Sequence, residues 1–215
     1  MTRINGNFKT VDNRKFSLKR GFSFFLRGNA VLSIIVIMIL SSQSSWNGAR
    51  GLVAFIMLIV WYEIMIILLS FAACFAPKYK IIPLRWSGEI NREKILGSIL
   101  VIVFLSILSW MWSDQGTIPL LSASIMVLMV CNLIFAFVSI FIQSAVISLF
   151  QINVEEKSTN SFSYAFKFLA IFGSGLNYYA QNVCSRLPFL FNKLLSIIFV
   201  FCILVSIFII ISIYT

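Results

Sequence analysis

Long runs of apolar residues decide what this chain can fold into. A helix needs about 20 mostly apolar residues to cross the hydrocarbon core of a bilayer, and several runs of that length occur in the 215 residues. Hydrophobic side chains make up 60% of the chain and charged ones 11%, whereas soluble domains carry roughly 45–50% and about 25%. The sequence therefore predicts an all-α, multispanning helical membrane protein with four to five transmembrane helices plus an interfacial helix.

Five segments qualify as spans by length and apolar content. The fourth, which begins at Pro119, would extend about 48 Å as a helix, against a hydrocarbon core of about 30 Å. It is too long for one crossing and too short for two, so we expect a single long helix whose last turns leave the bilayer and pack against protein. The five segments are residues 21–42, 51–75, 95–112, 119–150 and 194–214.

A sixth apolar segment, 161–180, is the main ambiguity in the span count. It contains Lys167 and two glycines, Gly173 and Gly175. Aromatic residues mixed with Lys suit the headgroup zone, which favours an interfacial or re-entrant helix. The alternative is four deep spans with one displaced segment.

The basic residues give the chain an orientation. The net charge is +10, from 17 Lys and Arg against 7 Asp and Glu. With five spans and a cytoplasmic N-terminus, sixteen of the 17 bases fall on one side and only Arg50 on the other, as expected for cytoplasmic loops. We divide the chain into a basic cytoplasmic N-terminal arm (1–20), a transmembrane bundle of four helices (21–150) with a basic cytoplasmic loop at 76–94, a cytoplasmic or interfacial segment (151–193), and a last transmembrane helix (194–215).

Glu63 is an acid near the middle of the second span. Asn132 occupies a similar depth in the fourth span, because both helices start from the outer face. Ionisable groups at the bilayer centre are costly and point to a function. We expect protonated Glu63 to donate to Asn132, within one chain or across a subunit contact. The favoured role is a polar clasp that fixes helix register; the alternatives are proton or ion coupling, or the lining of a wet cavity.

The fourth span carries a stripe of small and polar residues at helical spacing. Helix interfaces in membranes favour such residues, whereas lipid-facing surfaces do not need them. The stripe indicates packing within the chain, a homo-oligomer interface around a central axis or, with less support, a pore. Its members are Asn132, Ala136, Ser139 and Gln143.

The cytoplasmic loop at 76–94 combines bases with a tryptophan. Each Lys or Arg near an anionic leaflet contributes on the order of 1 kcal/mol, so lipid attraction and topology account for the charge. The functional alternative is docking of an acidic cytoplasmic partner, because Trp and Arg are common interaction hot spots. The candidate partner or lipid contacts are Lys78, Lys80, Arg85, Trp86, Arg92 and Lys94.

Catalytic and cofactor motifs are not found in the sequence. The chain has no histidine and four cysteines without a CxxC pair, which removes most metal-site and acid–base chemistry. No phosphate loop, nucleotide fingerprint, HExxH or GxSxG pattern is present. We therefore expect no enzyme activity, no cofactor, no metal and no direct nucleic-acid contact.

The layout of the whole chain, from the basic start MTRINGNFKT to the apolar terminal span, resembles the membrane subunit of the bacterial Kiwa antiphage defence system. The resemblance implies a homo-oligomeric inner-membrane protein that works with a cytoplasmic partner. That family has four spans, so the five counted here depart from it unless one segment is displaced. The favoured interpretation is a non-enzymatic scaffold or sensor of the bacterial inner membrane that recruits a cytoplasmic effector; the alternative is a small ion channel or proton-linked permease centred on Glu63, Asn132 and Gln143.

Overall fold

The structure is a computed structural model that describes residues 16–76, 91–113, 118–155 and 158–215. A short 3-10 turn, Gln43–Ser45, joins the first two helices, and no strand occurs in these ranges. The α-helices are α1 (Leu18–Leu40), α2 (Gly48–Phe75), α3 (Arg92–Ser113), α4 (Leu120–Glu155), α5 (Ser161–Cys184) and α6 (Phe189–Tyr214). The predicted all-α fold is confirmed.

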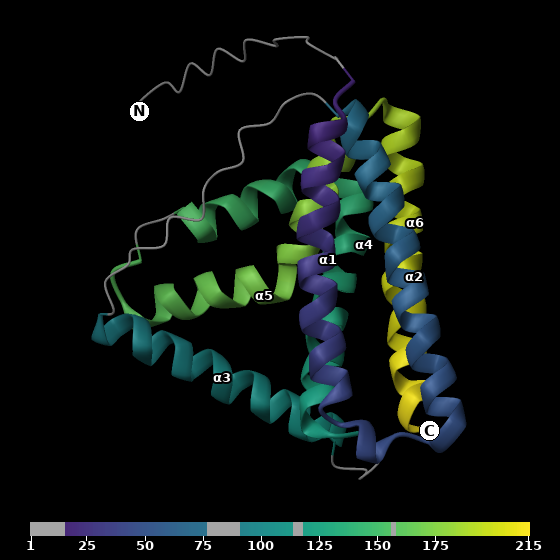
Figure 1. Cartoon of the computed structure of the whole chain (residues 1–215). Helices are drawn as coiled ribbons and strands as arrows, with labels where there is room; N and C mark the ends of the chain where they lie inside the picture. The colour runs from purple at the N-terminus through teal and green to yellow at the C-terminus, as the bar shows by residue number, and fades with distance from the viewer. Residues whose placement is uncertain (1–15, 77–90, 114–117, 156–157) are drawn as a thin grey trace.

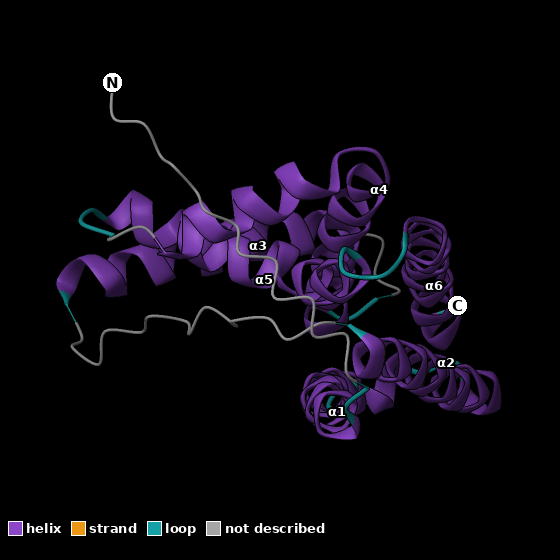
Figure 2. Ribbon diagram, turned by 90° about the horizontal axis from the view of Figure 1, so that it is seen from above, coloured by secondary structure: helices purple, strands orange, loops and turns teal. Residues whose placement is uncertain are grey.

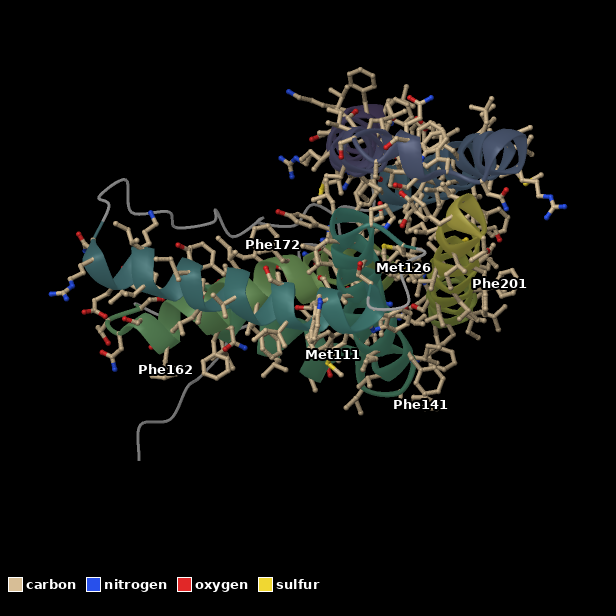
Figure 3. The ribbon with its side chains drawn as sticks, turned by 90° about the horizontal axis from the view of Figure 1, so that it is seen from below. Met111, Met126, Phe141, Phe162, Phe172 and Phe201 are labelled. Atoms are coloured by element: carbon tan, nitrogen blue, oxygen red, sulfur yellow. The ribbon has the colours of Figure 1, made fainter. Side chains whose placement is uncertain are left out.

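Four of the helices form an upright group, which consists of α1, α2, the first part of α4 and α6 (Figure 1). Seen from above, α1, α2 and α6 are viewed nearly along their axes, and α6 packs against both α2 and α4 (Figure 2). The core of this group is closed by Leu58 of α2, Met126 of α4 and Ile210 of α6, all of which are fully buried. Met126 lies among the helices, whereas Phe141 and Phe201 point outward (Figure 3).

The remaining helices form an arm on one side of the upright group. The arm consists of α3, α5 and the last part of α4 (Figure 1). The path of α4 changes at Ile142, whose φ of −126° and ψ of 52° are not helical. Beyond this break α4 turns towards the arm, where Phe150 stacks on Tyr178 of α5 with ring centroids 4.0 Å apart.

Three hydroxyl groups join the ends of α1, α4 and α6. The hydroxyl of Ser42, just after α1, lies 3.0 Å from the Ser122 hydroxyl and 2.8 Å from the Tyr214 hydroxyl. All three residues are buried, so each hydroxyl finds its hydrogen-bond partner within the protein. This end of the upright group is therefore fixed by polar contacts as well as by apolar packing.

The number of apolar helices agrees with the sequence prediction. By length and composition, five helices of the described chain can cross a membrane: α1, α2, α3, α4 and α6. The chain is thus a helical membrane protein. Segment 161–180 forms a helix, α5, that is not one of the five.

Two details of the fold differ from the prediction. The fourth helix is broken at Ile142 rather than continuous, although its last turns do pack against protein as expected. In addition, α3 lies obliquely in the arm instead of standing with the other spans (Figure 1), because its packing partners are α5 and α4 rather than α1 or α2.

A close approach at Gly97 holds α3 against α5. A Cβ added there would lie 2.6 Å from the Tyr164 Cβ and 2.7 Å from the Ser161 carbonyl oxygen, and neither atom is the end of a flexible side chain. By contrast, a Cβ added at Gly175, a glycine of α5, meets nothing within 4 Å. The two glycines therefore form a matched pair for testing this contact.

We expect Gly97→Leu to destabilise the folded chain by about 1–3 kcal/mol or more, because overpacking would force α3 away from α5. Thermal unfolding in detergent checks this. Gly175→Ala is the control; it has room and replaces a poor helix former, so it should leave the melting temperature unchanged or raise it. Equal melting temperatures for the Gly97→Leu variant and the unmodified chain would contradict the packing described.

Candidate functional site

Polar side chains from three helices meet where α4 breaks. We call this group the polar cluster. Most of its members are deeply buried, and it lies between apolar helices, where buried polar groups must find partners within the protein. The members are Asn132, Ser139 and Gln143 of α4, Asn177 and Gln181 of α5, and Asn192, Lys193 and Ser196 of α6.

Asn132 connects α4 to the backbone of α5. Its side-chain N–H donates to the Phe172 carbonyl oxygen at 3.2 Å, and its side-chain oxygen accepts from the Asn177 backbone N–H at 3.0 Å. The Asn177 amide donates in turn to the Ser139 hydroxyl at 3.2 Å. These contacts fix the register of α4 on α5.

Gln143 is the centre of the contacts beside the break. It donates to the Gln181 side-chain oxygen at 2.7 Å and to the Asn192 side-chain oxygen at 3.0 Å. Asn192 donates back to the Gln143 side-chain oxygen at 2.8 Å, and Ser196 donates to Gln181 at 3.1 Å. One glutamine thus links all three helices.

Lys193 satisfies a backbone group next to the break. Its ammonium donates to the carbonyl oxygen of Ile140, two residues before the non-helical Ile142. A helix break leaves carbonyl groups without their usual i+4 donors. The cation near the start of α6 therefore supplies a donor to α4 next to its break.

Two buried atoms of the polar cluster have no hydrogen-bond partner within the described part of the chain. They are the Asn177 side-chain oxygen and the Gln181 side-chain nitrogen, and both residues are 0% exposed. One is an acceptor and the other a donor, and they lie one helical turn apart on α5, roughly 5–6 Å between Cβ atoms. The polar cluster can therefore offer one acceptor and one donor to a further polar group.

The residues of the predicted stripe lie together on α4, and they pack against other helices of the same chain. Asn132, Ala136 and Ser139 are at most 3% exposed, and their neighbours belong to α5 of the same chain. Of the alternatives, packing within the chain is the one observed. The prediction that these residues and Gln143 line a subunit interface stays a prediction, although α5 and α6 already cover much of their surface.

Glu63 and Asn132 are not brought together within the chain. Tyr62, the preceding residue of α2, faces α4 and donates to the Met129 sulfur at 2.9 Å. Glu63 is rotated about 100° from Tyr62 on the helix and is half-buried. Asn132 instead uses its groups on α5, so the predicted clasp within one chain does not form.

Only two of the six residues predicted to contact a partner or lipid lie in the described part of the chain. Lys78, Lys80, Arg85 and Trp86 lie outside the described residues. Arg92 and Lys94 begin α3 at the tip of the arm, where Glu93 accepts hydrogen bonds from the Ser161 backbone N–H at 3.1 Å and from its hydroxyl. This contact places the start of α5 beside these bases.

Five of the eight members of the polar cluster were not predicted from the sequence. Asn177 and Gln181 are spaced four residues apart on α5, and Ser174 precedes them by three, which is the same helical pattern as the α4 stripe. Asn192, Lys193 and Ser196 also share one helical face. The signal that marks these residues is a stripe of polar side chains at helical spacing, and it is present on α5 and α6 as well as on α4.

No protein-family model, curated protein or solved structure matches this chain. In the described ranges, no three His, Cys, Asp or Glu side chains form a group that could hold a metal ion. The arrangement of the polar cluster is therefore the main structural evidence on what the chain does.

We expect Gln143→Leu to lower the stability of the folded chain by about 1–3 kcal/mol, because it leaves polar groups of Gln181 and Asn192 buried with fewer partners. Unfolding by denaturant titration in detergent measures the loss. Ser144→Leu is the matched control, because Ser144 is the next residue and is exposed. If both variants are as stable as the unmodified chain, Gln143 does not hold the three helices together.

Proposed function

We propose that the chain is a non-enzymatic, homo-oligomeric scaffold or sensor subunit of a bacterial inner membrane, which presents a basic cytoplasmic face to an effector protein. The observation that carries the proposal is the separation of charge along the upright group. Lys19 and Arg20 lie where α1 begins, and Arg186 and Lys193 lie where α6 begins, at the same end (Figure 1). Arg50 lies near the start of α2, at the opposite end.

This charge separation supports an orientation with the N-terminus in the cytoplasm. Lys and Arg are concentrated in cytoplasmic segments of membrane proteins. The helix α2 ends at Phe75, at the same end as the start of α1 (Figure 1), and the basic loop at 76–94 follows it in the sequence. A cytoplasmic partner with an acidic surface would be steered to this end by the opposite charge of Lys19, Arg20, Arg186 and Lys193.

The polar cluster supports a sensing role. It joins α4, α5 and α6 at a break in α4, and it contains one buried acceptor and one buried donor without a partner in the described part of the chain. A change in the membrane that moves the arm would have to rearrange these hydrogen bonds. Arg186, in the connection between α5 and α6, and Lys193, near the start of α6, would then move with it.

The role in antiphage defence and the homo-oligomer rest on the resemblance of the chain's layout to the Kiwa membrane subunit. The α4 stripe is used within the chain, so a second copy would contact other surfaces. The best candidate is α3, on which only Gly97, Val101 and Ser109 are buried. The scaffold needs no cofactor, metal or direct nucleic-acid contact.

Copurification with proteins encoded by neighbouring genes tests effector recruitment. Reversal of Lys78, Lys80 and Arg85 to Glu should abolish capture of the effector and the protection of cells against phage, because it removes the attraction for an acidic partner. Arg50→Glu is the control, since this base is placed on the opposite side. Equal capture by both variants, with both correctly inserted in the membrane, would contradict the proposal.

The channel or permease alternative rests on Glu63, which is half-buried in an apolar helix. The geometry supports it less, because Asn132 and Gln143 bond to α5 and α6 and not to Glu63. We expect Glu63→Gln to keep phage protection near the unmodified level, since a neutral amide suits the same position. Ion flux in proteoliposomes that Glu63→Gln abolishes, with assembly intact, would favour the alternative instead.

A further inference from the structure

A groove of about 220 Å³ lies in the arm between α3, α4 and α5. One wall is made by α3, and the opposite wall by both parts of α4, with Phe135 before the break and Val146 after it. The wall on α5 consists of small residues, Ala170, Gly173 and Ser174, which leave the space open. The groove therefore reaches the place where α4 changes direction, which we call its inner end.

Most of the groove is lined by apolar side chains. A cavity of about 150 Å³ with such a lining stays dry and binds a molecule the size of benzene, so this groove has room for part of one apolar chain. Ser174 adds little polarity, because its hydroxyl donates to the Ala170 carbonyl oxygen at 2.9 Å. Two of the three helices, α3 and α4, are long and apolar enough to cross a membrane. Lipid-soluble molecules are therefore the apolar ligands that can reach the groove.

The face of α5 that lines the groove continues to Asn177. Residues three and four apart are neighbours on a helix surface, and Asn177 follows the groove-lining Ser174 by three. The Asn177 amide donates to the Ser139 hydroxyl at 3.2 Å. Along α4, Ser139 lies between Phe135 and Val146, both of which line the groove. Asn177 is therefore the polar residue that follows the groove at its inner end.

The hydrogen bonds of Ser139 fix which atom of the Asn177 amide is unpaired. The Ser139 hydroxyl donates its only proton to the Phe135 carbonyl oxygen at 2.7 Å, so it can only accept from Asn177. The amide nitrogen of Asn177 must then face Ser139. Its oxygen, an acceptor, is left without a partner in the described part of the chain.

A similar argument identifies a donor one turn further along α5. The side-chain nitrogen of Gln143 donates to the Gln181 backbone carbonyl oxygen at 3.3 Å, which fixes the orientation of the Gln143 amide because a carbonyl oxygen only accepts. The same nitrogen donates to the Gln181 side-chain oxygen at 2.7 Å. The side-chain nitrogen of Gln181, a donor, is therefore the atom without a partner among the described residues.

A hydroxyl group matches this acceptor and this donor. It has one proton to donate and lone pairs that accept, so one hydroxyl oxygen between Asn177 and Gln181 satisfies both. The two side chains are roughly 5–6 Å apart at Cβ, a separation that two hydrogen bonds of about 2.7–3.0 Å each bridge. A carboxylate, phosphate or ether oxygen has no proton for the Asn177 oxygen, and an ammonium has no acceptor for the Gln181 nitrogen.

We propose that the groove binds an uncharged lipid with one apolar chain and a hydroxyl head, such as a long-chain alcohol. The chain lies between the walls of α3 and α4, and the hydroxyl donates to the Asn177 side-chain oxygen and accepts from the Gln181 side-chain nitrogen. Both residues are 0% exposed, so the head has to enter between α4 and α5 and part them beside the break. The ligand would give the proposed sensor its stimulus. Only that role rests on the proposed function, because binding is measured on the purified chain without effector or phage.

Competition in photo-cross-linking of the purified full-length chain tests the hydroxyl head. The probe is a ten-carbon alcohol with a diazirine on its chain, and its cross-links should map to the groove walls on α3, α4 and α5. Unlabelled 1-decanol should displace the probe at about tenfold lower concentration than decyl methyl ether, because the ether leaves the buried Asn177 oxygen unpaired. Equal displacement by the two compounds would overturn the hydroxyl assignment, and cross-links outside the groove alone would overturn the site.

Asn177→Leu should abolish the preference for the alcohol over the ether, because it removes the acceptor. Asn153→Leu is the matched control. Asn153 also lines the groove, but its amide donates to the Leu149 carbonyl oxygen within α4 at 2.9 Å, so this variant should keep the preference. An undiminished preference in a folded Asn177→Leu variant would show that the head is bound elsewhere.

Gly173→Leu tests the chain assignment. A Cβ at Gly173 first meets the Cys131 Cβ, at 3.6 Å, so a larger side chain enters the groove without breaking the backbone packing. It should remove most groove cross-links. Gly175→Leu is the matched control, because Gly175 does not line the groove and a Cβ there has open space. Groove cross-links that persist at full yield in the Gly173→Leu variant contradict the proposal.

Cys131 provides a test that needs no substitution, in case the variants do not fold. It lines the groove and is half-buried, whereas Cys74, Cys184 and Cys202 are buried. With 1-decanol at about ten times its half-maximal displacing concentration, about one site in eleven is free. N-ethylmaleimide should then modify Cys131 about tenfold more slowly than without the alcohol, as measured by mass spectrometry. An unchanged rate would refute binding in the groove.

Discussion

Where α4 breaks, its polar groups depend on hydrogen bonds from other helices, because buried polar groups without partners are costly. Lys193 donates to the Ile140 carbonyl oxygen, and Gln143 links α5 and α6 directly beside the break. These contacts allow α4 to change direction at Ile142. The new direction carries the last turns of α4 to Tyr178, which places α5, and α5 in turn holds α3. The direction of the arm thus depends on the break at Ile142, and apolar packing between α3, α4 and α5 holds the arm together.

The positions of the helices were predictable because each apolar run is long enough to need a membrane, and the helix ends fall within a few residues of the predicted bounds. The break was not predictable from local signals. Neither Pro nor Gly lies near Ile142, although such residues mark most helix kinks. The usable signal was length: a helix of 36 residues, Leu120–Glu155, is longer than any bilayer needs. The excess length indicates that part of the helix lies outside a single membrane crossing, but it does not give the residue at which the helix turns.

The partner of Asn132 illustrates why depth in a membrane does not determine contact. Glu63 and Asn132 were matched by counting residues along two spans, and counting gives height but not rotation about the helix axis. One residue changes the direction of a side chain by about 100°, and it is Tyr62 that faces Met129 of α4. The face of α4 that carries Asn132 is instead covered by α5. From its sequence, α5 was predicted to lie in the headgroup zone or to be re-entrant, and not to pack against this face of α4.

The two features of α5 that matter most share a peptide unit. Asn132 binds the carbonyl oxygen of Phe172, and the next residue, Gly173, forms part of the groove wall. Because packed interiors are rigid, a molecule that presses on Gly173 would act directly on the hydrogen bond of Asn132. The peptide unit between Phe172 and Gly173 thus connects the groove that Gly173 lines to the hydrogen bond of Asn132.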